Sequence, residues 1–205
     1  MRSTRVAQSA VIAAVVAATG VPLAASPAYA APMTVPYLCS RDVNGSPVIL
    51  HYQRGYDVTA PASVEPGEKF TVTFDNEPIN PLTNFNTEVW DVAVSFELPA
   101  NARYVGHTLT GGSNLGNSRQ SVEVRGNRIT LHATGPFKAG EDHDLPNLNV
   151  ELVAPERGEL VTAPAGTSAE DPGFRWTAQN PDTHEVFDLP CYPEKPAELS
   201  KTVVG

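Results

Sequence analysis

The densest group of side chains that could carry chemistry is the Glu-Asp-His-Asp run Glu141–Asp144. Carboxylate oxygens suit calcium, and the histidine could add a nitrogen ligand for zinc. The run lacks the Asp/Asn/Gly spacing of a calcium loop and the separated histidines of a zinc site. The sequence therefore favours a solvated, charged loop, and calcium binding there stays open, with loop carbonyls and Glu68 or Asp75 as the further ligands.

Signatures of nucleophilic catalysis are missing from the sequence. The five histidines stand singly, and the segment Gly112–Gly116 has a serine between glycines without the spacing of a nucleophile elbow. Neither cysteine has a neighbouring histidine or cation that would lower its pKa. We expect no catalytic residue, no metal site and no cofactor.

Two alternatives would need other side chains. A secreted hydrolase would pair two carboxylates about 5–10 Å apart across a cleft, and a carbohydrate-binding module would expose an aromatic row. Alternation places both tryptophans, Trp90 and Trp176, in the core instead. The strand-borne carboxylates, none of which the sequence pairs, are Glu88, Asp91, Glu97, Glu151 and Asp188.

The first thirty residues read as an export signal. Arg2 and Arg5 precede an uncharged run over residues 11–25, and Ala28-Tyr29-Ala30 ends it with small residues where a signal peptidase cuts. We expect residues 1–30 to be removed and the mature protein to be secreted, extracellular or associated with the cell wall, and not integral to a membrane.

The mature chain is strongly acidic. Two of the 14 basic residues lie in the leader, so 12 basic residues face 23 acidic ones and the formal charge is −11. This balance argues against nucleic acid and anionic lipid surfaces as partners and is compatible with calcium or a cationic partner.

The two cysteines, Cys39 and Cys191, are predicted to form a disulfide because the chain is exported to an oxidising compartment. They stand 152 positions apart and would clasp the two ends of the domain. The chain-entropy model gives such a loop about 5 kcal/mol of stabilisation.

Short alternating runs of bulky and polar residues predict strands and no helices. The pattern is clearest over residues 70–74, 90–98, 148–152 and 174–178. Residues 121–124 and 129–133 flank Gly126-Asn127 and predict a hairpin with a two-residue turn. Weaker strands are expected over residues 48–53, 56–60, 103–109, 159–162 and 185–189.

These elements position two polar loops, residues 76–86 and 111–118, where sandwiches commonly place binding contacts. About ten short strands without helical crossovers fit an antiparallel β-sandwich, with a barrel as the alternative. We expect one domain over residues 31–191 and a flexible tail over residues 192–205.

Three phrases of the chain, residues 62–74, 96–105 and 135–141, resemble the conserved-repeat, immunoglobulin-like modules of bacterial surface proteins. Such modules serve as stalks, adhesion units or scaffolds, so the resemblance implies an immunoglobulin-like fold and brings no catalytic residue. Asn101 stands where those modules usually have glycine, and the chain has one copy and a cysteine pair. Its layout is also similar to small exported proteins of high-GC Gram-positive bacteria.

Together these features predict a non-enzymatic, secreted, immunoglobulin-like β-sandwich that binds a cell-wall glycan, lipid or protein through its loops. The alternatives are a small secreted hydrolase or carbohydrate-binding module, and a carrier of an apolar ligand between the sheets.

Overall fold

The computed structural model of the protein describes residues 27–29, 32–43 and 45–205, and none of these residues lies in a helix. Fifteen strands are described where the sequence predicts about ten, because several are short or lie in segments without clear alternation. Their bounds are β1 (Pro27–Tyr29), β2 (Met33–Val43), β3 (Ser46–Pro61), β4 (Ser63–Val64), β5 (Lys69–Asn76), β6 (Glu88–Glu97), β7 (Arg103–Thr110), β8 (Gln120–Arg125), β9 (Arg128–Ala133), β10 (Phe137–Lys138), β11 (Asn147–Val153), β12 (Gly158–Pro164), β13 (Phe174–Gln179), β14 (Val186–Pro193) and β15 (Ser200–Val204).

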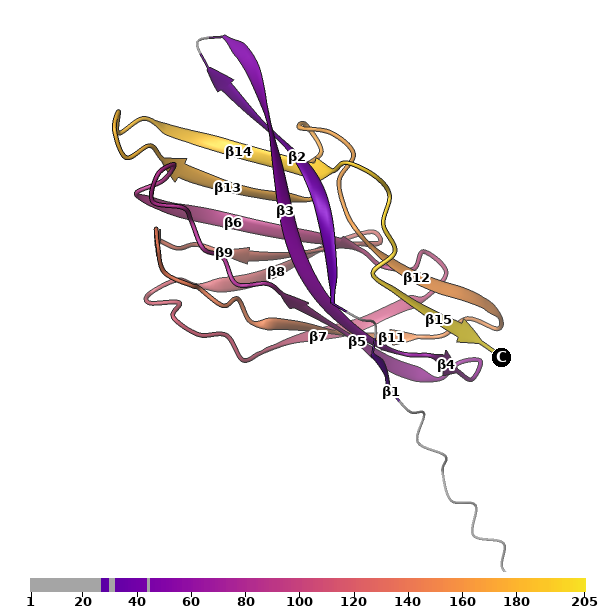
Figure 1. The fold of residues 1–205 in the computed structure, drawn as a ribbon. Coiled ribbons are helices and arrows are strands. Elements are labelled where there is room, and N and C mark those ends of the chain that lie inside the picture. Colours follow the sequence, from indigo (N-terminus) through magenta and orange to yellow (C-terminus); the bar gives the residue numbers. More distant parts are fainter. Residues whose placement is uncertain (1–26, 30–31, 44) are drawn as a thin grey trace, which may run out of the picture.

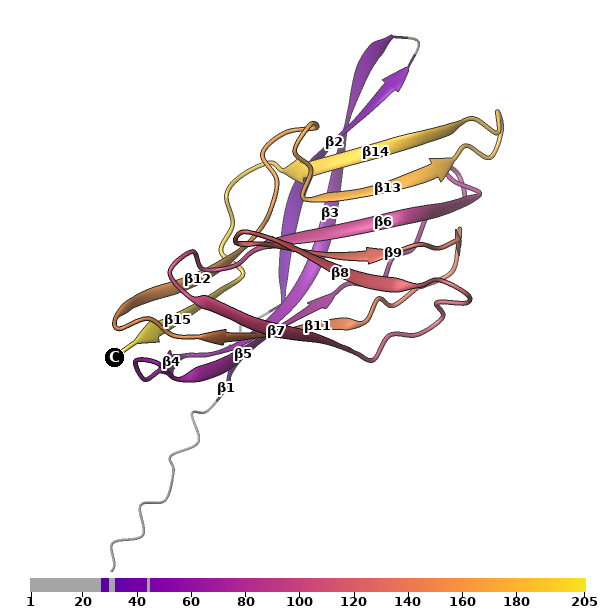
Figure 2. The same ribbon diagram turned by 180° about the vertical axis from the view of Figure 1, so that it is seen from behind.

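The strands form an immunoglobulin-like β-sandwich of two facing layers (Figures 1 and 2). One layer has the order β14-β13-β6-β9-β8, and the other has the order β3-β5-β11-β7. Strand β2 pairs with β14 on one side and β3 on the other, so the hydrogen bonding continues around that edge. Strands β12, β15 and β4 extend the structure beside β6.

The space between the layers is filled by the predicted alternating residues. Strands β5 and β11 pair with Phe74 opposite Leu148 and Phe70 opposite Leu152, and all four side chains are buried. The ring of Phe74 stacks on Phe96 of the facing layer with centroids 4.2 Å apart. This close contact between the layers argues against an apolar ligand held between them.

The prediction that both tryptophans lie in the core is correct for Trp176 and wrong for Trp90, which is only half-buried. Asp91 has a positive φ of 51°, and the pairing of β6 with β13 shifts register between Arg175 and Thr177. This irregularity is a β-bulge, which interrupts the alternation and turns Trp90 away from the core.

The hairpin predicted around Gly126-Asn127 is confirmed. Strands β8 and β9 pair along their whole length, and Arg125 lies directly opposite Arg128 across a two-residue turn. Gly126 has a φ of +62°, whereas Asn127 does not have a positive φ. The glycine alone therefore supplies the left-handed conformation that the sequence assigns to both turn residues.

Residues 192–205 do not form the predicted flexible tail. Strand β15 pairs with β12 and, in parallel, with β4. Its inward positions include Ser200 and Thr202, whose hydroxyls bond to Thr162 and to the carbonyl of Pro61. The prediction is wrong because hydroxyl side chains occupy the buried face and hide the alternation of apolar residues.

Two further predictions concern the N-terminal part of the chain. The separate strands predicted over residues 48–53 and 56–60 are one continuous strand, β3. The predicted signal peptide falls mostly outside the described residues, and its residues Pro27–Tyr29 form β1, which pairs with β3.

The predicted disulfide is confirmed. Cys39 of β2 and Cys191 of β14 are bonded through their sulfur atoms and lie directly opposite each other in the sheet. Both residues are fully buried. The bond therefore fastens the first long strand to the strand that ends the sandwich layer, as a clasp between distant parts of the chain.

Candidate functional site

Three loop segments meet at the end of the sandwich away from β15 (Figures 1 and 2). We call this surface the loop end and define it as residues 76–86, 111–118 and 138–144. His143 and Ile79 exchange backbone N–H···O=C bonds of 2.8 and 2.9 Å, and Asp144 and Ser113 exchange bonds of 2.9 and 3.0 Å. The Glu-Asp-His-Asp run thus pairs with a predicted binding loop on each side.

His143 is the centre of the loop end. Its side chain is only 4 % exposed, and its ring packs 5.2 Å from that of Phe137. Ring atom Nδ1 lies 2.7 Å from the carbonyl oxygen of Asn114, and Nε2 lies 2.9 Å from that of Lys138. The ring is thereby fixed between the backbone carbonyls of two different loops. The expectation of a solvated loop is therefore wrong for this residue.

Polar side chains brace the same loops from outside. Asn80 donates from Nδ2 to Oδ1 of Asp142 over 2.7 Å, and Asn114 donates to the Asp142 carbonyl over 2.8 Å. The Gly140 N–H donates to the carbonyl of Pro81 over 2.8 Å. Asp142 thus connects the loop of Asn80 to the loop of Asn114. Within the described residues, no group of three or more His, Cys, Asp or Glu side chains is arranged to hold a metal ion.

The loop end presents two apolar side chains to solvent. Leu82 is 57 % exposed and Phe85 is 59 % exposed, the highest values among the large apolar residues described. They are held together by a turn in which the Phe85 and Asn86 N–H groups both donate to the Leu82 carbonyl. Exposed aromatic side chains on fixed backbone are typical anchors of protein interfaces.

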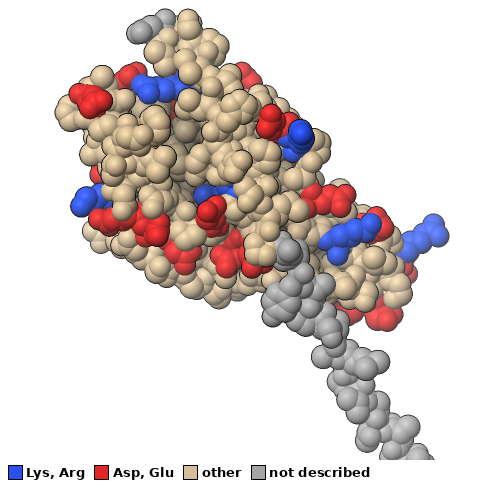
Figure 3. Space-filling view, viewed as in Figure 1, with Lys and Arg blue, Asp and Glu red and all other residues tan. Residues whose placement is uncertain are grey.

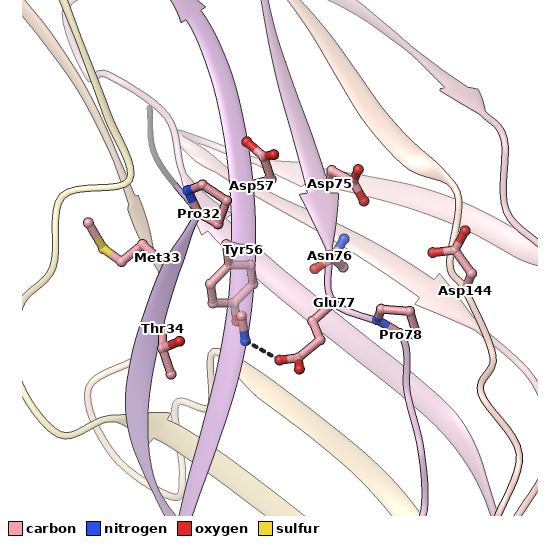
Figure 4. Close-up of a pocket in the computed structure, with 11 residues that line it drawn as sticks. Pro32, Met33, Thr34, Tyr56, Asp57, Asp75, Asn76, Glu77, Pro78 and Asp144 are labelled. Atoms are coloured by element: carbon pink, nitrogen blue, oxygen red, sulfur yellow. Dashed lines mark hydrogen bonds between the residues drawn. The ribbon is translucent and has the colours of Figure 1, made fainter. Parts of the chain in front are cut away.

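A pocket of about 530 Å³, which we call the acidic pocket, adjoins the loop end. Its acidic side chains are Asp57, Asp75, Glu77 and Asp144 (Figure 4). Asp57 of β3 and Asp75 of β5 are direct partners across the two strands, and Asp144 lies on the other side of β5. Figure 3 shows a band of acidic side chains across this face of the molecule.

The carboxylates of the acidic pocket differ in their environment. Glu77 is held by the backbone, because its Oε2 accepts the Gly55 N–H over 2.6 Å. The pKa of Asp75 is raised, first by partial burial and then by the negative charges of Asp144 and Asp57. Like charges that face one another across strands repel, so this pocket is an unfavourable place for further anions.

Three of the five strand-borne carboxylates named from the sequence are engaged by neighbours on their own sheets. Glu97 pairs with Arg128, and Glu151 pairs with Lys69. Asp188 accepts a hydrogen bond from Thr177 over 2.7 Å. These contacts are ordinary cross-strand pairs.

Of the two residues named as further ion ligands, the structure brings only Asp75 close to the Glu-Asp-His-Asp run. Glu68 accepts from the Glu65 N–H in its own turn, over 2.7 Å. Asp57 and Leu82 were not singled out by the sequence. The alternation of β3 could have placed Asp57 on an outward face, but its pairing with Asp75 depends on the register of β3 and β5.

A second exposed surface is the tip of the β2–β3 hairpin, which projects beyond the layers (Figures 1 and 2). Val48, Ile49 and Leu50 are exposed on its second strand. Arg41 of the first strand pairs with Glu185 over 2.8 Å, which ties the hairpin to the start of β14.

No known protein-family model matches the chain, and no curated protein matches its sequence. A solved chain of Corynebacterium diphtheriae, described provisionally as membrane-anchored, is similar with a TM-score of 0.51 and 14 % identity. A cohesin module of a family 33 glycoside hydrolase of Clostridium perfringens has a TM-score of 0.39 and 13 % identity, over 84 % of this chain and 100 % of that one. A type II cohesin domain of Acetivibrio cellulolyticus has a TM-score of 0.38 and 12 % identity, over 72 % of this chain and 89 % of that one.

The likeness to the corynebacterial chain bears on the fold, because the TM-scores of the two cohesin modules are below 0.5. It covers 85 % of this chain and 37 % of the corynebacterial one, so this chain spans little more than a third of that protein. It supports the β-sandwich fold seen here. In the part of the chain that the structure describes, no helix has the length and hydrophobicity to span a membrane.

Proposed function

We propose that this protein is exported to the cell envelope or the medium, where it acts without catalysis and binds a protein partner through the loop end. The observation that carries the proposal is the backbone bracing by His143 of loops that expose Leu82 and Phe85. Export is supported by the sequence of residues 1–30.

The bracing matters because an exposed side chain that is already fixed loses less conformational entropy on binding. The turn from Leu82 to Asn86 is held by two backbone hydrogen bonds. The turn exposes one aliphatic side chain, Leu82, and one aromatic side chain, Phe85, and the loop end also carries the polar side chains of Asn80 and Asp142. This is the usual anatomy of a protein-binding surface.

A protein partner is favoured over the glycan and lipid alternatives. A glycan platform needs a row of exposed aromatic rings, whereas Trp176 is buried in the core and Trp90 is half-buried beside a bulge. The acidic pocket beside the loop end disfavours anionic lipid headgroups. The close packing between the two layers disfavours a carrier of an apolar ligand. The contacts of Glu97, Glu151 and Asp188 with neighbouring strands disfavour a hydrolase.

The test is capture of a partner by the immobilised protein from an envelope protein fraction of the producing cells. We expect the double variant Leu82→Ser/Phe85→Ser to retain at least about tenfold less of the same protein than the wild type, the loss expected of an interface hot spot. The matched control is Val203→Ser, an exposed apolar residue on β15 at the other end of the sandwich, which should capture as the wild type does.

Equal capture by the double variant and the wild type would contradict the proposal. Loss of capture in Ile49→Ser alone, on the projecting hairpin, would also contradict it and move the binding surface to β3. Melting temperatures of all variants serve as the check that each is folded.

A further inference from the structure

The interior of the sandwich contains a charged side chain. Arg54 of β3 is only 1 % exposed and shares the inner face of its strand with the buried Tyr56 and Val58. Its Nη2 donates to the carbonyl oxygen of Glu77 over 3.1 Å, whereas Nε and Nη1 have no hydrogen-bond partner among the described residues. An arginine side chain stays protonated in proteins. Two nitrogens of a buried cation therefore carry N–H donors without an acceptor in the described part of the chain.

No carboxylate neutralises Arg54 by direct contact. Arg54 takes part in none of the ion pairs formed by the described residues, and the remaining residues of the sequence include no Asp or Glu. The carboxylate of Glu77 lies over Gly55, on the outer face of β3, and accepts the Gly55 N–H over 2.6 Å (Figure 4). Burial raises the pKa of Tyr56, so this neighbouring hydroxyl stays neutral and is not the counter-ion. A buried charge without a partner is strongly destabilising, so a counter-ion is expected.

A buried amide lies beside this cation. Asn76 is 1 % exposed, stands directly opposite Tyr56 at the end of β5, and shares the inner face with Phe74. Its position is diagonal to Arg54 across the strand pair, which is within reach of a long side chain. Neither Nδ2 nor Oδ1 of Asn76 has a hydrogen-bond partner among the described residues. Arg54 and Asn76 therefore bring unpartnered N–H donors to the same part of the core.

Aromatic side chains flank the guanidinium group. Its Cζ lies 4.8 Å from the ring centre of Phe174 and 5.9 Å from that of Tyr56. The hydroxyl oxygens of Tyr37 and Tyr56 are 2.6 Å apart and both residues are buried. One hydroxyl donates to the other, so the pair has one further O–H to donate. A positive charge with several donors in surroundings of low dielectric favours an anion strongly.

We propose that Arg54 and Asn76 bind a small monovalent anion of the halide class, such as chloride, inside the sandwich. The ion would neutralise the guanidinium and accept hydrogen bonds from both side chains. A small ion is favoured over a phosphate or an organic acid because the side chains that would hold it are buried. The inference does not rest on the proposed function. Asn76 is also the first residue of the loop end, so the ion would fasten the start of the loop that exposes Leu82 and Phe85.

The experiment compares melting temperatures in different anions. The purified product of the full-length chain is refolded from urea that contains no halide, and is then melted at neutral pH in sodium gluconate or sodium chloride of equal ionic strength. We expect chloride to raise the melting temperature along a saturating curve, by about 3 °C or more once its concentration is about tenfold above Kd. Bromide should act in the same way, and anomalous diffraction from crystals grown in sodium bromide should place the ion against Arg54 and Asn76.

Asn76→Asp is the most informative variant, because it supplies a carboxylate beside Arg54 from the chain itself. It should melt in gluconate at least as high as the wild type melts in chloride, and chloride should not raise its melting temperature further. Arg54→Met removes the cation and should also abolish the response to chloride. The matched control is Gln53→Glu, which adds the same charge as Asn76→Asp at an exposed position of β3 and should respond to chloride as the wild type does.

Equal melting temperatures of the wild type in chloride and in gluconate would overturn the inference. A chloride response that persists in Asn76→Asp or in Arg54→Met would also overturn it, because the response would then be a general effect of salt. So would a bromide-grown crystal with only an ordered water beside Arg54, which would assign the unpartnered donors to solvent.

Discussion

His143 contacts three segments of the chain that lie far apart in sequence. Its backbone pairs with Ile79, and its ring reaches the carbonyls of Asn114 and Lys138. A single buried side chain thus completes the hydrogen bonding of loops that have little hydrophobic core of their own. Its contribution is structural, although the residue stands in a run whose composition suggests metal binding.

We predict that His143→Gln lowers the free energy of unfolding by about 2 kcal/mol, because both N–H donors of the amide sit on one nitrogen and cannot replace two ring nitrogens that contact carbonyls of different loops. Urea unfolding measures the change. The matched control is His107→Gln, at an exposed histidine that contacts the Tyr104 hydroxyl, and it should change stability by less than about 0.5 kcal/mol. Equal effects of the two substitutions would contradict the role of His143.

A second prediction concerns Asp75 and pH. Its pKa is raised by burial, Asp144 and Asp57, so ionisation of Asp75 is less favourable in the folded than in the unfolded state. The folded state therefore loses stability as pH rises through the raised pKa, and the effect vanishes at low pH where both states are protonated. Asp75→Asn should raise the melting temperature near pH 7, and this gain should disappear by about pH 3.

Thermal melts of the wild type and Asp75→Asn across that pH range test this prediction. A substitution that destabilises the protein at neutral pH more than at acid pH would show that the Asp75 charge is favourable in the fold.

Among the elements, the sequence identifies strands whose inner face is uniformly apolar. This holds for β11 and for β5 as far as Phe74, where large apolar residues alternate with Thr, Asn and Glu. It fails for β2, although Val35, Tyr37 and Cys39 alternate as buried residues, because Pro36 and Leu38 obscure the polar face. A bulge such as that at Asp91 is equally hidden, since it arises from the register of two strands.

Gly173, which precedes β13, gives a prediction about how closely the elements approach. A Cβ at this position would overlap the carbonyl oxygen of Ala165, and the Gly173 backbone already bonds to Cys191 and Ser95. Gly173→Ala should therefore cost more than about 4 kcal/mol or prevent folding. Secreted yield and urea unfolding measure this. Gly106→Ala in β7 is the matched control, because its Cβ would meet nothing within 4 Å.

If Gly173→Ala melts within a few degrees of Gly106→Ala, the close approach of the two backbones at Ala165 is not present in solution.

For the whole molecule, the disulfide is the main covalent constraint. It closes a loop with a sequence separation of 152. We predict that Cys39→Ala/Cys191→Ala lowers the free energy of unfolding by about 3–5 kcal/mol, chiefly because the unfolded chain regains its freedom. Urea unfolding of the variant, and of the reduced wild type as its control, should give similar values. A variant as stable as the oxidised wild type would contradict this.

The sequence predicts the separate loops of the loop end but not that they meet. Residues 76–86, 111–118 and 141–144 each stood out as polar loops, but their meeting depends on strand pairings between distant segments, which sequence patterns do not encode. The exposure of Phe85 and the pairing of Asp57 with Asp75 follow from the same long-range contacts. The predicted flexible tail fails for the related reason that β15 is stabilised by tertiary pairing.

The most direct measurement is native-state hydrogen exchange of the loop-end amides. The amides of Ile79, Ser113, His143 and Asp144 each bond to another loop. If the loop end is a single braced surface, we expect these four amides to exchange slowly and to become exposed together. Fast exchange of these four amides, while the strands of both layers stay protected, would show that the loops move independently and that no preformed binding surface exists at this end.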